Sequence, residues 1–369
     1  MALELLRLHR VAMPLVRPFR TSFGTETERD VIVVEAVTSD GIHGWGECAT
    51  MSWPGYSSEY SEGALDVIRH HLLPALAGTS MDPLEAQAAL APVRGHFMAK
   101  SAVLTALLDA WLRARNESLG AYLGAVRAQV DCGVSVGIPS SLSALVDEVD
   151  SYVEAGYRRI KLKMEPGWDL EPVRVIRERY PDIALQTDAN QAYTRSDIPL
   201  LTQFDDLNLL LIEQPLPEED WYGHVLASRA CATPICMDES ILTVESADSA
   251  IALGAASIIN IKPGRVGGYL HAKAIHDRCL ELGAPVWCGG MLETGIGRAA
   301  NVALAALPGF TLPGDTSASS RYFAEDLTEP FVLDDGRLTV PTGPGIGVDP
   351  LPEVMAGLTM SVEELRVNV

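Results

Sequence analysis

Basic residues are scarce in this sequence. Among 369 residues there are 28 lysines and arginines against 49 aspartates and glutamates, which gives a formal net charge of −21. A surface with this excess of negative charge repels nucleic-acid phosphates and anionic lipid headgroups. We therefore exclude nucleic acid and membrane surfaces as partners. A small anionic substrate remains compatible with the composition, because a single site can carry the opposite charge to the whole.

Features typical of several other protein classes are also missing. No stretch approaches 18 uncharged apolar residues, and the N-terminus lacks the regions of a signal peptide, so we predict neither a membrane span nor secretion. The six cysteines form no C-x-x-C pair, which favours buried thiols in a reducing cytoplasm. H-E-x-x-H, G-x-S-x-G and phosphate-loop motifs are absent too, so zinc proteases, serine hydrolases and P-loop enzymes gain no support.

What is present is a globular composition, 47% hydrophobic and 21% charged, whose pattern changes near residue 125. Three runs, 3–13, 30–39 and 42–50, predict a small antiparallel sheet. We expect the polar stretches 16–29 and 51–60 to be loops. Apolar residues then recur at helical spacing over 61–125. The first 125 residues therefore predict a separate α+β domain.

From about residue 126 to 320, short apolar runs alternate with helical stretches. Residues near the C-terminal ends of the eight runs follow one another at steps of 24 to 27: Val136, Lys161, Asp188, Glu213, Asp238, Lys262, Cys288 and Pro313. One strand, one helix and two short loops need about this length. Eight such units in series favour a parallel barrel of the TIM type, with a doubly wound open sheet as the alternative. We expect residues 321–369 to form loops that pack back on the N-terminal domain.

Charged residues end five consecutive runs of this barrel. Asp188, Glu213 and Asp238 end the third, fourth and fifth strands. Three carboxylates on adjacent strand ends repel one another unless a cation lies between them. Oxygen ligands without histidine or cysteine favour magnesium, with manganese as a substitute. The spacing therefore predicts a divalent metal site, although each acid alone is more often a solvated loop residue or a helix cap.

Lysines end the strands on either side of these acids. Lys161 and Lys163 lie two apart on the second strand, so both point into the barrel, and Lys262 ends the sixth. A lysine near other cations and partly desolvated has a lowered pKa and can act as a base. We expect Arg265 to favour the neutral amine of Lys262 by repulsion. Salt bridges to the acids are the alternative role for these lysines.

Metal and lysine together suit removal of a proton α to a carboxylate. Lewis-acid stabilisation of the resulting enediolate makes such a weak carbon acid accessible to an amine base. Reprotonation of the enediolate gives racemisation, and loss of a β-leaving group gives elimination. The predicted substrate is accordingly a small carboxylate.

The sequence resembles the enolase superfamily. Members of that superfamily use a lysine base together with magnesium, which agrees with the lysines and acids at the predicted strand ends. The resemblance rests on IKLKMEPGWD, LQTDANQAYT, LLIEQPL, PICMDES and NIKPGRVGGY, in that order, and covers essentially the whole chain. K-x-K on the second strand and a lysine on the sixth are similar to the muconate-cycloisomerase-like subgroup. PFRTSFGTE, GWGECATM, YSSEY, VSVGI and WCGGMLETGIGRAAN look most like the o-succinylbenzoate synthases that also racemise N-acylamino acids, especially N-succinylamino acids.

The resemblance implies an α/β fold: a (β/α)7β barrel with an α+β capping domain that the C-terminal segment completes. It implies that Asp188, Glu213 and Asp238 bind magnesium, that Lys163 and Lys262 are the two acid/base groups, and that Lys161 assists near the substrate carboxylate. Asn190 and Glu239 become supporting groups behind the ligands. The family also usually assembles, so we expect a homo-oligomer.

The capping domain of that family shapes specificity, which directs attention to apolar residues in the polar loops. Phe19, Phe23, Met51 and Tyr56 suit a lid over the barrel mouth, with packing inside the cap as the alternative. At the barrel rim we expect Ser135, Leu292 and the Gly289-Gly290 pair to contact substrate, since glycines allow close approach to the backbone.

Several activities fit these residues. Dehydration to o-succinylbenzoate, a step of menaquinone biosynthesis, and racemisation of N-succinylamino or other N-acylamino acids are favoured. Muconate cycloisomerisation and dipeptide epimerisation are the alternatives within the superfamily. The latter needs an acidic pair on the eighth strand, where Asp315 stands alone. A metal-free Schiff-base aldolase and a non-catalytic barrel are alternatives of other classes.

Overall fold

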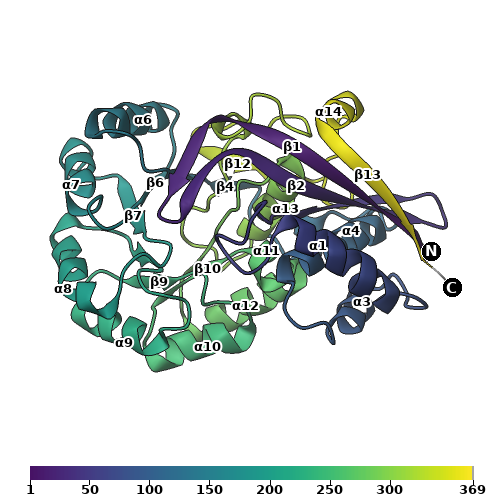
Figure 1. Ribbon diagram of the computed structural model, residues 1–369, viewed down its shortest axis with the longest axis horizontal. Coiled ribbons are helices and arrows are strands. Elements are labelled where there is room, and N and C mark those ends of the chain that lie inside the picture. Colours follow the sequence, from purple (N-terminus) through teal and green to yellow (C-terminus); the bar gives the residue numbers. More distant parts are fainter. Residues whose placement is uncertain (368–369) are drawn as a thin grey trace.

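The computed structural model describes residues 1–367. The three predicted strands near the N-terminus are present as β1 (Leu3–Thr21), β2 (Gly24–Thr38) and β3 (His43–Cys48), and β2 carries a continuous buried run in its second half. A fourth strand from the end of the chain, β13 (Thr359–Arg366), pairs with β1. The antiparallel sheet has the order β13-β1-β2-β3, so both ends of the described chain lie in it (Figure 1).

The loop predicted over 16–29 is wrong, because most of it is strand. β1 and β2 continue to a tight turn at Ser22 and Phe23, and pairing resumes at Phe19 after an irregular stretch that contains Pro18. The missing N–H of Pro18 therefore costs no ladder bond, and the two arms satisfy each other's remaining backbone groups. The hairpin tip reaches the second domain, where the Ser22 hydroxyl donates to the carbonyl of Ala189 at 3.0 Å. Residues 51–60, by contrast, hold no helix or strand beyond single bridges, as expected.

Helices cover one face of this sheet. The longest is α4 (Phe97–Arg113), which packs on β3 because Gly44 and Gly46 lack side chains; a Cβ on Gly46 would lie 2.1 Å from the Ala102 carbonyl oxygen. The other helices of this part are α1 (Ser61–Val67), α2 (Leu73–Ala75), α3 (Pro83–Leu90) and α5 (Leu119–Leu123).

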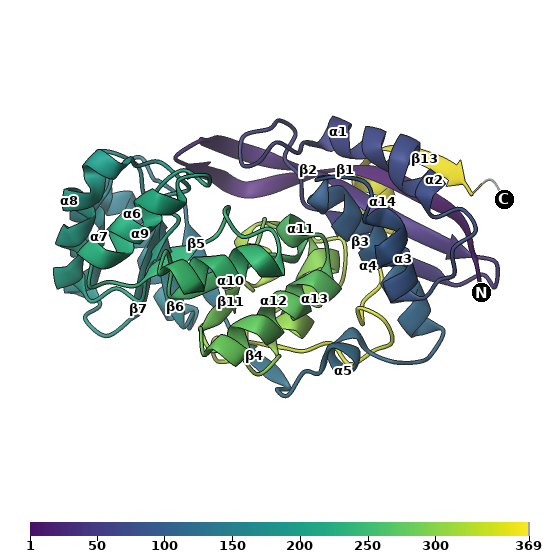
Figure 2. The same ribbon diagram turned by 90° about the horizontal axis from the view of Figure 1, so that it is seen from below.

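The second sheet is parallel and has seven strands in sequential order, β5 to β11. Its strands are β5 (Gly133–Val136), β6 (Arg159–Lys163), β7 (Ala184–Asp188), β8 (Ile212–Glu213), β9 (Ile235–Met237), β10 (Ile258–Ile261) and β11 (Val286–Cys288). The connecting helices are α6 (Leu142–Glu154), α7 (Leu170–Arg179), α8 (Ile198–Leu201), α9 (Trp221–Ala230), α10 (Val244–Leu253), α11 (Pro263–Val266), α12 (Tyr269–Leu282) and α13 (Gly295–Ala305). Figures 1 and 2 show the helices on the outside of the curled sheet.

The eighth predicted run, near Pro313, does not form a strand. It contributes two parallel bridges, from Phe310 to Val286 and from Gly314 to Cys132. Gly133 N–H donates to the Gly314 carbonyl at 2.7 Å, and Asp315 N–H donates to the Cys288 carbonyl at 2.8 Å. Pro313 lacks an N–H, which prevents a regular ladder. The fold is thus an α/β fold with a curled parallel sheet, both edges of which contact residues 310–315.

The last part of the described chain forms a small two-stranded sheet and then joins the antiparallel sheet. β12 (Arg337–Thr339) pairs with β4 (Gln129–Asp131), after a turn in which Asp335 and Gly336 both have positive φ, at 47° and 72°. α14 (Pro352–Leu358) leads into β13. Residues 368 and 369, the end of the predicted C-terminal segment, lie outside the described residues.

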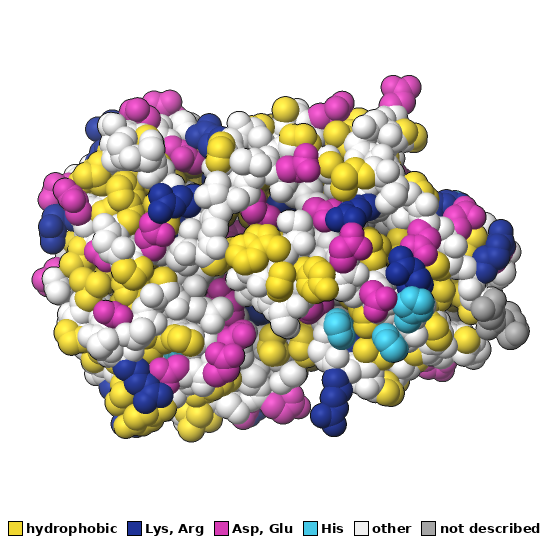
Figure 3. Space-filling model, viewed as in Figure 1, with side chains coloured by type: hydrophobic (Ala, Val, Ile, Leu, Met, Phe, Trp, Pro, Cys, Tyr) yellow, Lys and Arg dark blue, Asp and Glu magenta, His cyan; other side chains and the backbone are white. Residues whose placement is uncertain are grey.

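Two predictions about composition can be compared with the structure directly. The six cysteines are all buried and unpaired within residues 1–367: Cys48, Cys132, Cys231, Cys236, Cys279 and Cys288. The helices of this part of the chain are all too short or too polar to cross a membrane. Figure 3 shows acidic side chains scattered over one face of the molecule rather than gathered at one place.

Candidate active site

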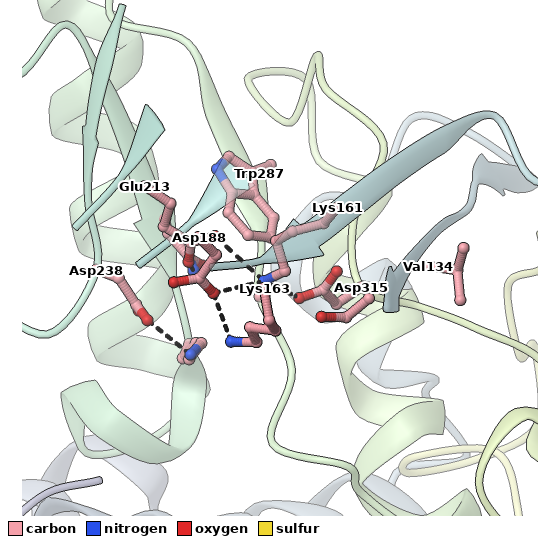
Figure 4. Close-up of polar contacts among 12 residues, drawn as sticks. Val134, Lys161, Lys163, Asp188, Glu213, Asp238, Trp287 and Asp315 are labelled. Atoms are coloured by element: carbon pink, nitrogen blue, oxygen red, sulfur yellow. Dashed lines mark hydrogen bonds and ion pairs between the residues drawn. The ribbon is translucent and has the colours of Figure 1, made fainter. Parts of the chain in front are cut away.

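The charged strand ends converge at one end of the parallel sheet (Figure 4). Strand register places Lys163 beside Asp188, and Asp188 beside Glu213. Asp238 follows β9 and Lys262 follows β10. Asp188, Glu213 and Asp238 have no exposed surface. Equal βα spacing therefore brings together the residues that the sequence singled out.

Each buried carboxylate of this cluster contacts an ammonium group. Lys163 Nζ donates to Asp188 Oδ2 at 2.6 Å, and Lys262 Nζ donates to Asp238 Oδ2 at 2.7 Å. Lys161 Nζ donates to Glu213 Oε2 at 3.2 Å and lies 3.3 Å from Asp188 Oδ2. The predicted alternative, salt bridges between lysines and acids, thus describes the contacts in this structure. These contacts also bring the three lysine amines close together around the carboxylates.

Further polar side chains lie behind the lysines and acids and hydrogen-bond to them. Asn190 accepts from Lys163 Nζ at 2.6 Å and donates to Glu239 Oε1 at 3.0 Å. Burial, reinforced by Asp188, raises the pKa of Glu239 to about 7. Arg265 Nε donates to the Ile241 carbonyl at 2.8 Å, and its guanidinium also pairs with Asp238. The sequence-predicted supporting residues therefore lie directly behind the lysines and acids.

The two lysines differ in pKa, contrary to expectation. Burial lowers the pKa of Lys163, as predicted, because it outweighs the attraction of Asp188. Burial also disfavours the charge on Lys262, but Tyr56 and the surrounding carboxylates outweigh it and raise that pKa. Arg265 does not offset them, because its guanidinium is directed at Asp238 and backbone carbonyls.

Sequence reasoning assigned no role in this cluster to three of its residues. Asp315 Oδ2 accepts from Lys161 Nζ at 2.7 Å, and its other oxygen accepts two bonds from Arg159 at 2.9 Å. The Trp287 ring centroid lies 4.8 Å from Lys161 Nζ. Asp315 follows the eighth apolar run as the other acids follow theirs, a signal that was available. Arg159 and Trp287 begin or occupy strands, and nothing in the spacing distinguishes them.

The capping loops complete a small cavity above the lysines. Its volume is about 40 Å³, and the predicted residues that line it are Phe19, Phe23, Met51, Tyr56, Lys163, Asn190, Lys262, Gly290 and Leu292. Tyr56 reaches deepest, since its hydroxyl donates to Asp238 Oδ2 at 3.2 Å and accepts from Lys262 Nζ at 3.1 Å. Ligand pockets usually exceed ~300 Å³, so the cavity in this conformation is smaller than a typical ligand site.

Two of the predicted contact residues do not line this cavity. Ser135 pairs with Lys161 in strand register and is 5% exposed, and its hydroxyl has no partner within residues 1–367. A Cβ on Gly289 would lie 2.2 Å from Asn260 Oδ1, so this glycine makes room for Asn260. Asn260 in turn donates to Glu213 Oε1 at 2.7 Å. Gly289 therefore supports the acid cluster from behind.

The backbone is strained where it leaves these strands. Asn190, Gln214 and Leu292 have φ of 41°, 34° and 57°, in the left-handed region that non-glycine residues seldom adopt. Such conformations cost about 1–3 kcal/mol each and persist where surrounding structure fixes them, typically at functional sites. All three follow strands whose ends carry the cluster or line the cavity.

The donor chemistry of the cluster fits a hard divalent cation. Three fully buried carboxylates end adjacent strands, and neither histidine nor thiol lies among them. Their oxygens face the three lysines here, and no three histidine, cysteine, aspartate or glutamate side chains within residues 1–367 are grouped as a metal shell. Glu239 Oε2 is also buried without a partner in the described part of the chain. The residues thus suit Mg²⁺ in kind, and they stand at the ends of adjacent strands.

Comparison with known proteins identifies the family of the chain. Residues 5–124 match the mandelate racemase/muconate lactonizing enzyme N-terminal domain, and residues 144–354 match the enolase C-terminal domain-like family. An N-succinylamino acid racemase from an Amycolatopsis species is 58% identical over 361 residues, covering 97% of this chain and 98% of the relative. An o-succinylbenzoate synthase from Bacillus subtilis is 43% identical over 355 residues, covering 96% and 95%.

A solved structure of an enolase-superfamily protein from Listeria innocua superimposes with a TM-score of 0.96 at 40% identity, covering all of both chains. Members of this superfamily generally use a divalent metal, usually Mg²⁺. The family expected from the motifs is therefore confirmed: this chain belongs to the enolase superfamily, with both domains of its mandelate racemase/muconate lactonizing enzyme group.

Proposed function

We propose that this protein removes a proton α to a carboxylate, and that it catalyses syn-dehydration to o-succinylbenzoate, racemisation of N-succinylamino acids, or both. The observation that carries the proposal is the presence of Lys163 and Lys262 on the wall of one cavity, from strands four steps apart in the sheet. The named relatives, an N-succinylamino acid racemase and an o-succinylbenzoate synthase, support the choice of substrate.

The two amines divide the work by position. The lowered pKa of Lys163 suits a neutral amine that accepts the α-proton on one side of the substrate. The raised pKa of Lys262 suits an ammonium group that delivers a proton from the other side. Racemisation uses both, with their roles exchanged for the opposite enantiomer. Elimination uses one of the two as base, and the same group, once protonated, gives its proton to the departing hydroxyl so that water leaves. The positive charge of the second stabilises the enediolate.

Asp188, Glu213 and Asp238 would hold a divalent cation, Mg²⁺ or Mn²⁺. When bound, it would supply Lewis-acid withdrawal of charge from the substrate carboxylate. Lys161, fixed between Glu213 and Asp315, adds a positive charge on the same side. Phe19, Phe23 and Met51 exclude water above the lysines, and Asn190 and Glu239 orient Lys163 from behind.

The same proposal includes the finer organisation of the chain. Contacts of residues 310–315 with both sheet edges support a closed (β/α)7β barrel. We assign residues 1–125 to the capping domain, 126–320 to the barrel and 321–369 to a segment that packs back on the cap; pairing of β13 with β1 supports the last assignment. A cytoplasmic homo-oligomer remains our prediction, and the six buried free thiols support a reducing compartment.

Dipeptide epimerisation and muconate cycloisomerisation are the alternatives within the superfamily. The carboxylate of Asp315 is fully engaged by Lys161 and Arg159, which leaves no free acid on that strand end for a substrate amine. An L-Ala-D/L-Glu epimerase from Bacillus subtilis is 29% identical, well below the racemase and synthase relatives. These two observations favour an acyl-blocked substrate.

The decisive assay offers the purified enzyme both the menaquinone-pathway precursor and N-succinylamino acids, with a dipeptide and muconate as comparison substrates. We expect turnover of one or both of the first two, loss of that turnover with EDTA, and recovery on addition of Mg²⁺. A Schiff-base aldolase would instead be trapped by borohydride and would survive EDTA. Turnover of the dipeptide or muconate alone would replace the proposed substrate class.

A further inference from the structure

The loop between β11 and α13 forms one side of the cavity and has to be held in shape. Gly290, Met291 and Leu292 of this loop line the cavity, and Leu292 is in the strained left-handed region. Glu293, at the end of the loop, accepts from the Met291 N–H at 2.8 Å and from Asn301 Nδ2 at 3.0 Å. These bonds close the loop on itself and tie it to α13. They do not connect it to the capping domain.

The polar connection to the capping domain comes from Glu47 of β3, beside Met291, whose side chain packs in the apolar core of that domain. Gly44 and Gly46 lie against α4, so the alternation of the strand turns Glu47 to the opposite side, toward α13. Its Oε1 accepts from the Thr294 N–H at 3.0 Å, and its Oε2 accepts from the Thr294 hydroxyl at 2.7 Å and the Gly297 N–H at 2.9 Å. Glu47 thus bonds to Thr294, the last residue before α13, which lies 247 positions further along the chain.

Burying the Glu47 carboxylate at the start of α13 is energetically unfavourable. Glu47 is 8% exposed, and burial together with the nearby Glu293 carboxylate raises its pKa to about 7. The sequence also keeps space for it, since a Cβ on Gly297 would lie 2.9 Å from both Glu47 Oε2 and the Glu293 side chain. The partners are the first N–H groups of an 11-residue helix, which favour a carboxylate.

We propose that Glu47 is a positioning residue: it latches the capping domain to the cavity-lining loop 289–294 and so sets how tightly substrate is held. The inference rests on the proposed function for its kinetic consequence, although the latch itself is a matter of structure. The catalytic lysines and the acids lie on strands that Glu47 does not touch. Loss of the latch therefore weakens binding of substrate more than it slows the proton transfers.

A matched control exists at the same helix end. Asp326 also binds the start of α13, through the Gly295 N–H at 2.7 Å, and it further accepts from the Leu327 N–H and the Ser319 hydroxyl. Its partners lie within residues 295–327 and not in the capping sheet. Glu47→Gln and Asp326→Asn thus each remove one carboxylate from the same helix, but only the first unlatches the cap.

The test measures kcat and KM of both variants on an N-succinylamino acid and on the menaquinone-pathway precursor, together with hydrogen–deuterium exchange of residues 286–294. For Glu47→Gln we expect KM to rise about tenfold with kcat within about twofold, and faster exchange of that segment. Asp326→Asn should leave KM unchanged within about twofold. If Glu47→Gln does not fold, Thr294→Val is measured in its place, because this substitution removes the hydroxyl group that donates to Glu47.

Two outcomes would overturn the latch: an unchanged KM and unchanged exchange in Glu47→Gln, or the same changes in Asp326→Asn. A wild-type enzyme inactive on both substrates would instead refute the proposed function. In that case the exchange comparison between the two variants still decides whether Glu47 holds the loop.

Discussion

The cavity is bounded by two regions whose side chains differ in chemistry. Below it, charged side chains stand on strand ends in fixed register, as with Lys163 beside Asp188. Above it, apolar side chains such as Phe19 and Met51 come from a hairpin tip and a loop. The floor is ionic, whereas the cover is mostly apolar, with the Arg29–Glu26 ion pair of β2 as its charged part. The difference indicates that chemistry is assigned to the floor and substrate selection to the cover.

The largest effect should come from removing an amine of the floor. Lys163→Ala and Lys262→Ala should each lower turnover in both reactions by about 10³-fold or more, because racemisation loses one of its two acid/base groups and dehydration loses either its base or the charge that stabilises its enediolate. Exchange of the α-proton with solvent deuterium should survive on one stereoface only, opposite in the two variants. Lys273→Ala, which alters a half-exposed ion pair with Asp277 on α12, is the control. Near-normal turnover in either variant would refute the two-base assignment.

The floor was also the part that the sequence revealed best. Asp188, Glu213 and Asp238 could be found because the βα repeat itself places them, and strand register then leaves them little freedom. The cover was less accessible, since the stretch 16–29 has a polar, glycine-containing composition typical of a loop but is paired strand. Its pairing depends on the partner arm and not on local propensity. The opposite pKa shifts of Lys163 and Lys262 likewise depend on side chains from several elements.

Asp315 offers an intermediate test, because it belongs to the floor but acts through Lys161, a role that the sequence analysis did not assign to it. Asp315→Asn removes a charge that holds Lys161, and we expect kcat/KM to fall about 10- to 100-fold, as for other residues that orient active-site groups. Asp131→Asn, an aspartate that pairs with Arg337 on the surface, is the matched control. Unfolding by urea should be measured in parallel. Unchanged kcat/KM in a folded Asp315→Asn would remove it from the site.

The cover should respond in KM rather than in kcat. Phe23→Ala shortens a side chain that lines the cavity and packs on Tyr56, with ring centroids 6.3 Å apart. We expect KM to rise about tenfold while kcat changes little, since the lysines are untouched. Val332→Ala, at a residue 74% exposed and far from the cavity, should leave both constants unchanged. A fall in kcat alone would mean that the cover takes part in the proton transfers.

The smallest effect on activity is expected from an ionic cluster of the capping sheet whose residues do not line the cavity. Glu35 of β2 is buried, which alone would raise its pKa, but hydrogen bonds from His9, His43 and Arg7 hold that pKa at about 2. A carboxyl group with a depressed folded-state pKa stabilises the fold above its unfolded value near 4.5, and this stabilisation is lost as pH falls from there toward 2.

Glu35→Gln should therefore lower the free energy of unfolding at pH 7 by about 2 kcal/mol, a figure reduced for screening by solvent. The difference from the wild type should shrink between pH 4.5 and pH 2, where the wild-type carboxyl also becomes neutral. Urea unfolding at several pH values measures both, and kcat and KM at pH 7 should not change. A raised KM in a folded Glu35→Gln would show that charge in the cap, and not only its apolar loops, reaches the cavity. The division between an ionic floor and an apolar cover would then fail, because the cap would act on substrate through its electrostatics.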